Sequence, residues 1–131
     1  MSECVFCDIA IRDPKGQVLK YYSKGSLGGY TDVVVIEPLN PCVEGHLLFI
    51  PKSHIDKVGD TLGITPKVVG DVMMAVSQYL AEKELEANVI INNGKVAEQT
   101  VFHLHVHIIP RREGDGVQLP WTYQREVSHI K

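Results

Sequence analysis

Three histidines alternate with apolar residues in the stretch HLHVHIIP, residues 103–110. Neutral imidazole is the commonest metal ligand among side chains, and its ring nitrogen can also act as a nucleophile. If the stretch is a β-strand, His103, His105 and His107 point to one face, because successive side chains alternate across a strand. The residues between them then face the core. The spacing therefore predicts a sheet with one apolar face and one histidine face.

Two kinds of chemistry fit this row of histidines. In the first, the row binds a metal such as zinc. In the second, one ring nitrogen attacks phosphorus while its other nitrogen is held as a hydrogen-bond donor. The preceding loop offers donors at Asn92, Gly94, Gln99 and Thr100, which suit phosphate oxygens, and few carboxylates lie beside the row. These neighbours favour phosphate chemistry and leave metal binding open.

The chain has three cysteines, of which Cys4 and Cys7 form a C-x-x-C pair and Cys42 stands alone. An odd count speaks against a disulfide framework. The pair fits either a metal site or a buried helix start, and Cys42 is expected to be a small buried hydrophobe.

The hydrophobic pattern predicts an α+β domain. β-Branched or apolar runs predict strands over residues 18–22, 30–37, 45–50, 89–92 and 102–109. Thr65 and Pro66 predict a helix start, with the Thr65 hydroxyl as cap and proline at the first helical position. The helix should end near residues 83–86 and place one face on the core: Val69, Val72, Met73, Val76, Tyr79 and Leu80. GSLGG at 25–29 is typical of a turn. Because strands and helices do not alternate regularly, an antiparallel sheet is favoured over a parallel one.

Size and charge narrow the class of protein. The 131 residues suit a single domain, and the net charge of −3 speaks against a general binder of nucleic acid or membrane surfaces. No stretch approaches the roughly 20 apolar residues of a membrane span, and the first residues do not resemble a signal peptide. We therefore expect a cytoplasmic protein without nucleic-acid or membrane partners.

Longer stretches resemble the histidine triad (HIT) superfamily. NNGKVAEQTVFHLHVHIIPR is similar to the family signature, and CVFCDIA and NPCVEGHLLFIPKSHI stand before it in family order. The resemblance covers residues 4–112 approximately, followed by a tail over 113–131, and implies a single HIT domain over 1–131. It implies a five-stranded antiparallel sheet with one long helix and a short N-terminal helix, paired as a homodimer.

The resemblance also implies an activity, which is nucleotidyl hydrolysis or transfer through a covalent nucleotidyl-histidine. The substrates would be purine nucleoside phosphate esters, anhydrides or phosphoramidates. By position, His105 is the nucleophile, His107 donates to the phosphate or leaving group, and His46 lies nearby. Asn92, Gln99 and Thr100 match family positions that hold the phosphate or the surroundings of the nucleophile. Two alternatives remain: a nucleotide-binding regulatory module with little turnover, and a zinc-dependent hydrolase that uses the whole row.

Zinc-bearing members of the superfamily imply a second site. Its ligands here would be Cys4, Cys7, His54 and His103, a Cys₂His₂ set for a structural zinc; no organic cofactor is implied.

The sequence departs from the family at two positions. Glu98 replaces a frequent glycine, and its simplest interpretation is a solvated loop carboxylate. Pro38 stands where many members have an aspartate that holds the ribose hydroxyls, and Glu37 is the candidate to replace it. In the tail, Trp121 is expected to pack, with a role over a base or a dimer partner as the alternative, and His129 is expected to be exposed.

Overall fold

A computed structural model describes residues 4–122; His129 lies outside the described residues. The elements follow one another as α1 (Val5–Ile11), β1 (Val18–Tyr22), α2 (Lys24–Leu27), β2 (Val33–Ile36), β3 (Leu47–Pro51), α3 (Thr65–Lys83), β4 (Ala87–Ile90) and β5 (Val106–Pro110). The strands form a five-stranded sheet in the order β1-β2-β3-β5-β4, and every neighbouring pair is antiparallel. The predicted fold class is confirmed.

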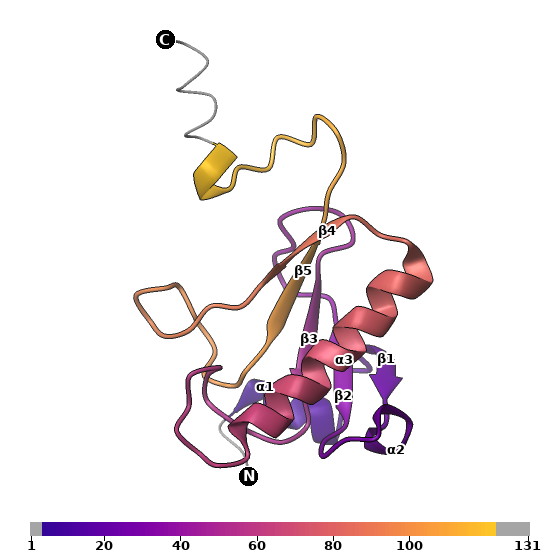
Figure 1. Cartoon of the computed structure of the whole chain (residues 1–131), viewed down its shortest axis with the longest axis vertical. Helices are drawn as coiled ribbons and strands as arrows, with labels where there is room; N and C mark the ends of the chain where they lie inside the picture. The colour runs from indigo at the N-terminus through magenta and orange to yellow at the C-terminus, as the bar shows by residue number, and fades with distance from the viewer. Residues whose placement is uncertain (1–3, 123–131) are drawn as a thin grey trace.

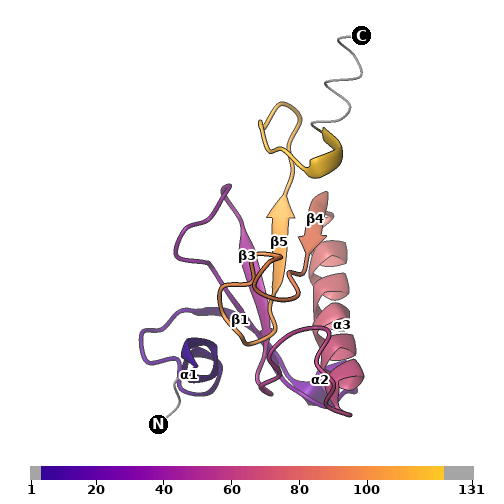
Figure 2. The same cartoon turned by 90° about the vertical axis from the view of Figure 1, so that its left-hand side faces the viewer.

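Helices α1 and α3 lie on opposite faces of the sheet. Figure 2 shows α1 on one side of the strands and α3 on the other, and Figure 1 shows α3 crossing the sheet. The larger core lies between the sheet and α3, and includes Leu104, Val106 and Ile108. A smaller core lies under α1: Phe6, Ile9, Ala10, Val34, Ile36, Leu48 and Ile50. The apolar residues of the HLHVHI stretch therefore anchor it on the α3 side, as predicted.

Helix α3 confirms the predicted apolar face but not the predicted cap. Ile64 is the N-cap without a side-chain hydrogen bond, and the Thr65 hydroxyl is buried without a partner among the described residues. Pro66 lies in the first turn, where its missing N–H costs nothing. The fully buried positions are Val68, Val72, Ala75 and Val76, with the other predicted side chains packed beside them. The helix thus begins one residue earlier than the cap prediction required.

The last strand is shorter than predicted, because it begins at Val106 instead of residue 102. The ladder with β3 starts at the pair Phe49 and Val106. Before it, the backbone N–H of Leu104 donates to the Ile55 carbonyl at 2.8 Å, so this segment binds a loop instead of a strand. His103 and His105 therefore stand just ahead of the sheet. Two further predictions differ from the structure. The strand predicted over 30–37 is limited to β2, which covers only the buried centre of that run. The turn predicted over 25–29 is preceded by a short helix, Lys24–Leu27, that overlaps it.

Residues 111–122, which follow β5, extend away from the sheet in both views (Figures 1 and 2). Arg111 pairs with Asp115 and holds the first turn of this segment. Trp121 is 57% exposed, so the expectation that it packs within the chain is wrong. Within residues 4–122, every helix is too short or too polar to cross a bilayer.

Candidate active site and metal centre

His105 is buried, and one of its ring nitrogens is already engaged. Its Nδ1 lies 2.8 Å from the carbonyl oxygen of His103. A carbonyl can only accept, so Nδ1 carries the proton and donates. In the neutral ring Nε2 then bears a free lone pair. Burial lowers the pKa of His105, which favours this neutral form. The backbone thus prepares Nε2 as a nucleophile.

His107 has the opposite arrangement, set by a chain of hydrogen bonds. The backbone N–H of Cys42 donates to His46 Nδ1 at 3.1 Å. His46 must then carry its proton on Nε2, which donates to His107 Nδ1 at 3.0 Å. His107 in turn carries its proton on Nε2, which is buried and has no partner among the described residues. His105 and His107, whose ring centroids lie 5.2 Å apart, therefore offer one nucleophile and one donor side by side.

Both histidines line a cavity of about 430 Å³ on the α1 face. His46, which contacts His107, and Thr100 also line this cavity. The apolar wall comes from α1, β2 and β3: Val5, Phe6, Ile9, Ile36 and Leu48. The remaining lining is Lys15, Gln17, Glu37, Pro38, Leu39, Asn40 and Val101. The cavity is of the size that small-molecule ligands occupy.

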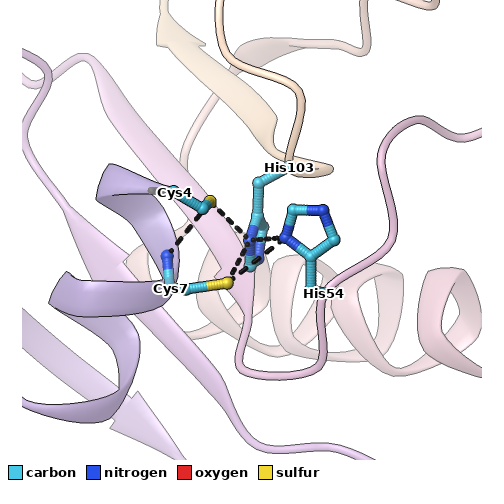
Figure 3. A group of neighbouring side chains, drawn as sticks. All are labelled: Cys4, Cys7, His54 and His103. Atoms are coloured by element: carbon cyan, nitrogen blue, oxygen red, sulfur yellow. Dashed lines mark hydrogen bonds between the residues drawn. The ribbon is translucent and has the colours of Figure 1, made fainter. Parts of the chain in front are cut away.

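A second cluster brings together the four residues that the sequence proposed as metal ligands (Figure 3). Cys4 and Cys7 come from the start of α1, His54 from the loop after β3, and His103 from the segment before β5 (Figure 3). Their ligand atoms all lie within 4.8 Å of one another. Cys7 Sγ is 3.2 Å from His54 Nδ1, and Cys4 Sγ is 3.4 Å from His103 Nδ1.

The shortest of these separations, 3.1–3.4 Å, are close to those in a tetrahedral zinc site. Zinc bonds of about 2.3 Å to sulfur and about 2.0–2.1 Å to nitrogen give ligand separations of roughly 3.3–3.8 Å. The two Nδ1 atoms lie 3.1 Å apart, and each ring's other nitrogen already faces an acceptor. His103 Nε2 lies 2.7 Å from the Pro51 carbonyl, and His54 Nε2 lies 2.8 Å from Asp56 Oδ1. Such partners direct the Nδ1 lone pairs toward a metal, so the donor set fits zinc.

Comparisons with known proteins identify the family of this chain. The model of the HIT domain family matches residues 26–114. The chain belongs to the HIT domain family. Yeast (Saccharomyces cerevisiae) adenosine 5′-monophosphoramidase HNT1 is 39% identical over 125 residues, which cover 94% of this chain and 72% of that one.

Solved structures of HIT proteins share the fold. A HIT family hydrolase from Clostridium thermocellum has a TM-score of 0.71 at 27% identity, covering 91% of this chain and 99% of that one. A zinc-bound histidine triad family protein from Mycobacterium smegmatis has a TM-score of 0.65 at 31% identity and covers 98% of both chains.

Two predicted substrate-binding residues of the HIT chain do not line the cavity. Gln99 is 3% exposed; its amide nitrogen donates to the carbonyls of Asp56 and Val101, and its oxygen accepts from Gly94. Asn92 donates to the Glu98 carbonyl. Both side chains therefore close the loop that precedes the histidines. They support the site through this loop and do not line the cavity.

The side chains of Glu98 and Cys42 are both exposed. Glu98 is exposed and does not line the cavity, which agrees with a solvated loop carboxylate. Cys42 is exposed, so the expectation of a buried thiol is wrong. Its contribution comes from the backbone, which donates to His46. The residue types alone gave no signal for this role, because the donor is the main chain.

Sequence reasoning also missed most of the cavity wall. Val5, Phe6 and Ile9 lie at positions i, i+1 and i+4 of α1, a spacing that places them on one face of a helix. That spacing could have identified the apolar wall. Lys15 and Gln17 had no such signal, because a short irregular loop carries them.

The buried position of His107 makes a testable prediction for the HIT protein's stability. Burial, together with the nearby charges of His105 and His46, lowers the pKa of His107 from 6.5 to about 4. The unfolded chain then takes up this proton at higher pH than the native protein. The free energy of unfolding should fall as the pH decreases from about 6.5 to about 4, with a contribution from His107 of up to about 3 kcal/mol.

Urea unfolding at several pH values measures this contribution when wild type is compared with His107→Asn. The variant should lose stability less steeply on acidification. All other ionisable groups are common to the two proteins, so the difference between their slopes reports on His107. Equal slopes for the two proteins would contradict the prediction.

Proposed function

We propose that this HIT protein is a nucleotidyl hydrolase or transferase that works through a covalent intermediate on His105. The observation that carries the proposal is the opposed protonation of two adjacent rings. His105 presents a lone pair on Nε2, while His107 presents an N–H, and both line one cavity. A nucleophile beside a donor is the pair that attack on a phosphoryl group requires.

The proposed reaction has two steps. His105 Nε2 attacks the α-phosphorus, the bond to the leaving group breaks, and its electron pair departs with that group, which takes up a proton from water. The proposed donors to the phosphoryl oxygens are His107 Nε2–H and the Thr100 hydroxyl, since both residues line the cavity with His105. Water then attacks the nucleotidyl-histidine, the nitrogen–phosphorus bond breaks, and a nucleoside monophosphate leaves. The neutral Nε2 lone pair of His105 is restored.

The proposed substrates are purine nucleoside phosphate esters, anhydrides or phosphoramidates. Two relatives support this class. HNT1 is an adenosine 5′-monophosphoramidase, and HINT3 of Arabidopsis thaliana, 36% identical over 120 residues that cover 87% of this chain and 55% of that one, is an adenylylsulfatase. The apolar wall suits a base, and the histidine end suits a phosphate. We further propose that residues 1–131 are one HIT domain, which acts as a cytoplasmic homodimer without an organic cofactor.

We propose a structural role for zinc at Cys4, Cys7, His54 and His103. Four protein ligands complete a tetrahedral shell and leave no position for substrate or water, in contrast to catalytic zinc sites. When bound, the metal would cross-link α1, the loop after β3 and the segment before β5. This closed shell favours chemistry at His105 over a zinc-dependent hydrolase that uses the whole row.

Incubation of wild-type protein with a purine nucleoside phosphoramidate, followed by chromatography, tests the activity. We expect release of the nucleoside monophosphate with multiple turnovers. Measuring the binding of the monophosphate in parallel distinguishes a hydrolase from the alternative, a nucleotide-binding regulatory module. Tight binding with no product over hours would reject the hydrolase and favour that module.

A further inference from the structure

The cavity has a second polar end, remote from the histidines. Paired residues form one row across the sheet: Val18 with Ile36, Ile36 with Leu48, and Leu48 with His107. Three strand spacings of about 4.8 Å place Val18 roughly 14 Å from His107. Gln17 and Glu37 are the next residues outward from the first pair. The cavity thus runs from the reactive histidines to the outer ends of β1 and β2.

A loop with many internal hydrogen bonds carries Lys15 and Gln17 at this outer end. The Asp13 carboxylate accepts from the backbone N–H groups of Gln17 at 2.5 Å and Val18 at 3.2 Å. The Gly16 N–H donates to the Asp13 carbonyl, and Gly16 has a φ of 64°, which glycine adopts without strain. These bonds fix the backbone of the loop, from which the exposed Lys15 and the half-buried Gln17 line the cavity.

Two opposite charges stand at the outer end without neutralising each other. Among the described residues that line the cavity, Lys15 and Glu37 are the members with full charges at neutral pH. In the part of the chain that the structure describes, neither forms an ion pair with the other or with a third residue. An ammonium donor and a carboxylate acceptor are thus both available to a ligand.

We propose that Lys15 and Glu37 read the edge of a 6-oxopurine base, so that guanine nucleotides are preferred over adenine nucleotides. This inference rests on the proposed function. Guanine presents acceptors at O6 and N7, which suit a lysine, and donors at N1 and N2, which suit a carboxylate. Adenine presents an amino group at position 6 and an acceptor at N1. Its amino group would therefore face the Lys15 ammonium, which is also a donor. Its N1 would face the Glu37 carboxylate, which is also an acceptor.

The apolar middle of the cavity fits this orientation. Val5, Phe6 and Ile9 of α1 line it together with Ile36 and Leu48 of the sheet. A flat base lying on these side chains would direct its polar edge toward Lys15 and Glu37 and its ribose phosphate toward His105. Pro38 lies in the same wall and offers only hydrocarbon, so discrimination falls to the base and not to the ribose at this point.

Equilibrium binding of GMP, IMP and AMP to the full-length protein tests the proposal. GMP should bind about 10- to 100-fold more tightly than AMP, the range for one well-placed pair of hydrogen bonds to a base edge. IMP keeps O6 and N1–H but lacks the 2-amino group, so it should lie between the two. AMP binding equal to or tighter than GMP binding would overturn the proposal.

Variants assign the preference to the two side chains. Lys15→Met and Glu37→Gln should each reduce the ratio of GMP to AMP affinity at least severalfold, with little change for AMP. Matched controls are Lys95→Met and Glu44→Gln, which are exposed and do not line the cavity. An unchanged ratio in both cavity variants would overturn the proposal.

Turnover is measured separately with guanosine and adenosine phosphoramidates. Equal hydrolysis of both substrates would leave the proposed function standing and reject the base preference. Preferential GMP binding without hydrolysis of either would support the base site and reject the proposed hydrolase.

Discussion

Replacing His105 by alanine should reduce nucleoside monophosphate release by on the order of 10³-fold or more, because the variant lacks the atom that attacks phosphorus. His105 Nε2 is the ring nitrogen left with a lone pair by the hydrogen bond to the His103 carbonyl. No neighbouring group can take its place: the Nδ1 atoms of His46 and His107 each accept a hydrogen bond from within the chain. The loss should appear in kcat as well as in kcat/KM.

Mass spectrometry after brief mixing with substrate gives a second, direct measurement. The wild-type protein should carry one nucleotidyl group, located on His105 by peptide mapping. His107→Ala is the matched control, because it removes a neighbouring imidazole and keeps the nucleophile. It should still form the adduct, more slowly. An adduct on another residue, or undiminished turnover by His105→Ala, would reject the covalent mechanism.

Removing zinc should lower the melting temperature by roughly 10 to 20 °C. A ligand present at a thousandfold its Kd stabilises the native state by about 4 kcal/mol, which corresponds to such a shift for a domain of this size. The cluster joins α1 to two segments, the loop after β3 and the stretch before β5, that are otherwise held to each other by hydrogen bonds such as that from the Leu104 N–H to the Ile55 carbonyl (Figure 3). Calorimetry of the protein with and without a strong chelator, together with metal analysis, checks the prediction.

Cysteine variants separate the metal from general effects of the chelator. Cys4→Ser should lose both the metal and the stabilisation, and should no longer respond to chelator. Cys42→Ser is the matched control, since Cys42 is exposed and outside the cluster. Should chelation abolish hydrolysis while the melting temperature stays constant, the metal would be catalytic and the structural assignment would be rejected.

Much of the fold was predictable, because it follows from local patterns. Strands β2 and β3 follow from runs of consecutive apolar residues. Helix α3 follows from apolar residues at helical spacing. Both patterns are visible in the sequence because they reflect which side chains are buried. The alternation in HLHVHI held although His103 and His105 precede the strand. Its apolar members are fixed in the α3-side core, so the histidines must lie on the other face whether or not the backbone pairs.

Site residues were predictable where the chemistry of the side chain itself defines the role. They were less predictable where the fold of the backbone determines what the side chain contacts. The metal ligands are soft or imidazole donors, and the structure brings all four together. Gln99, in contrast, is an amide that suits phosphate and backbone equally well, and three local hydrogen bonds engage it. Lys15 reaches the cavity through a turn held by Asp13, which residue spacing does not reveal.

The metal cluster has a consequence for the order of events during folding. His103 is 99 residues from Cys4 and 49 from His54, so the ligands meet only after two long loops have closed. Closing such loops costs chain entropy, which the sheet and the α3 core must first offset. Zinc would therefore bind at full strength only once the rest of the domain has formed. An interaction completed so late slows unfolding and leaves the folding rate nearly unchanged. With zinc bound as proposed, the cluster would therefore extend the lifetime of the folded protein.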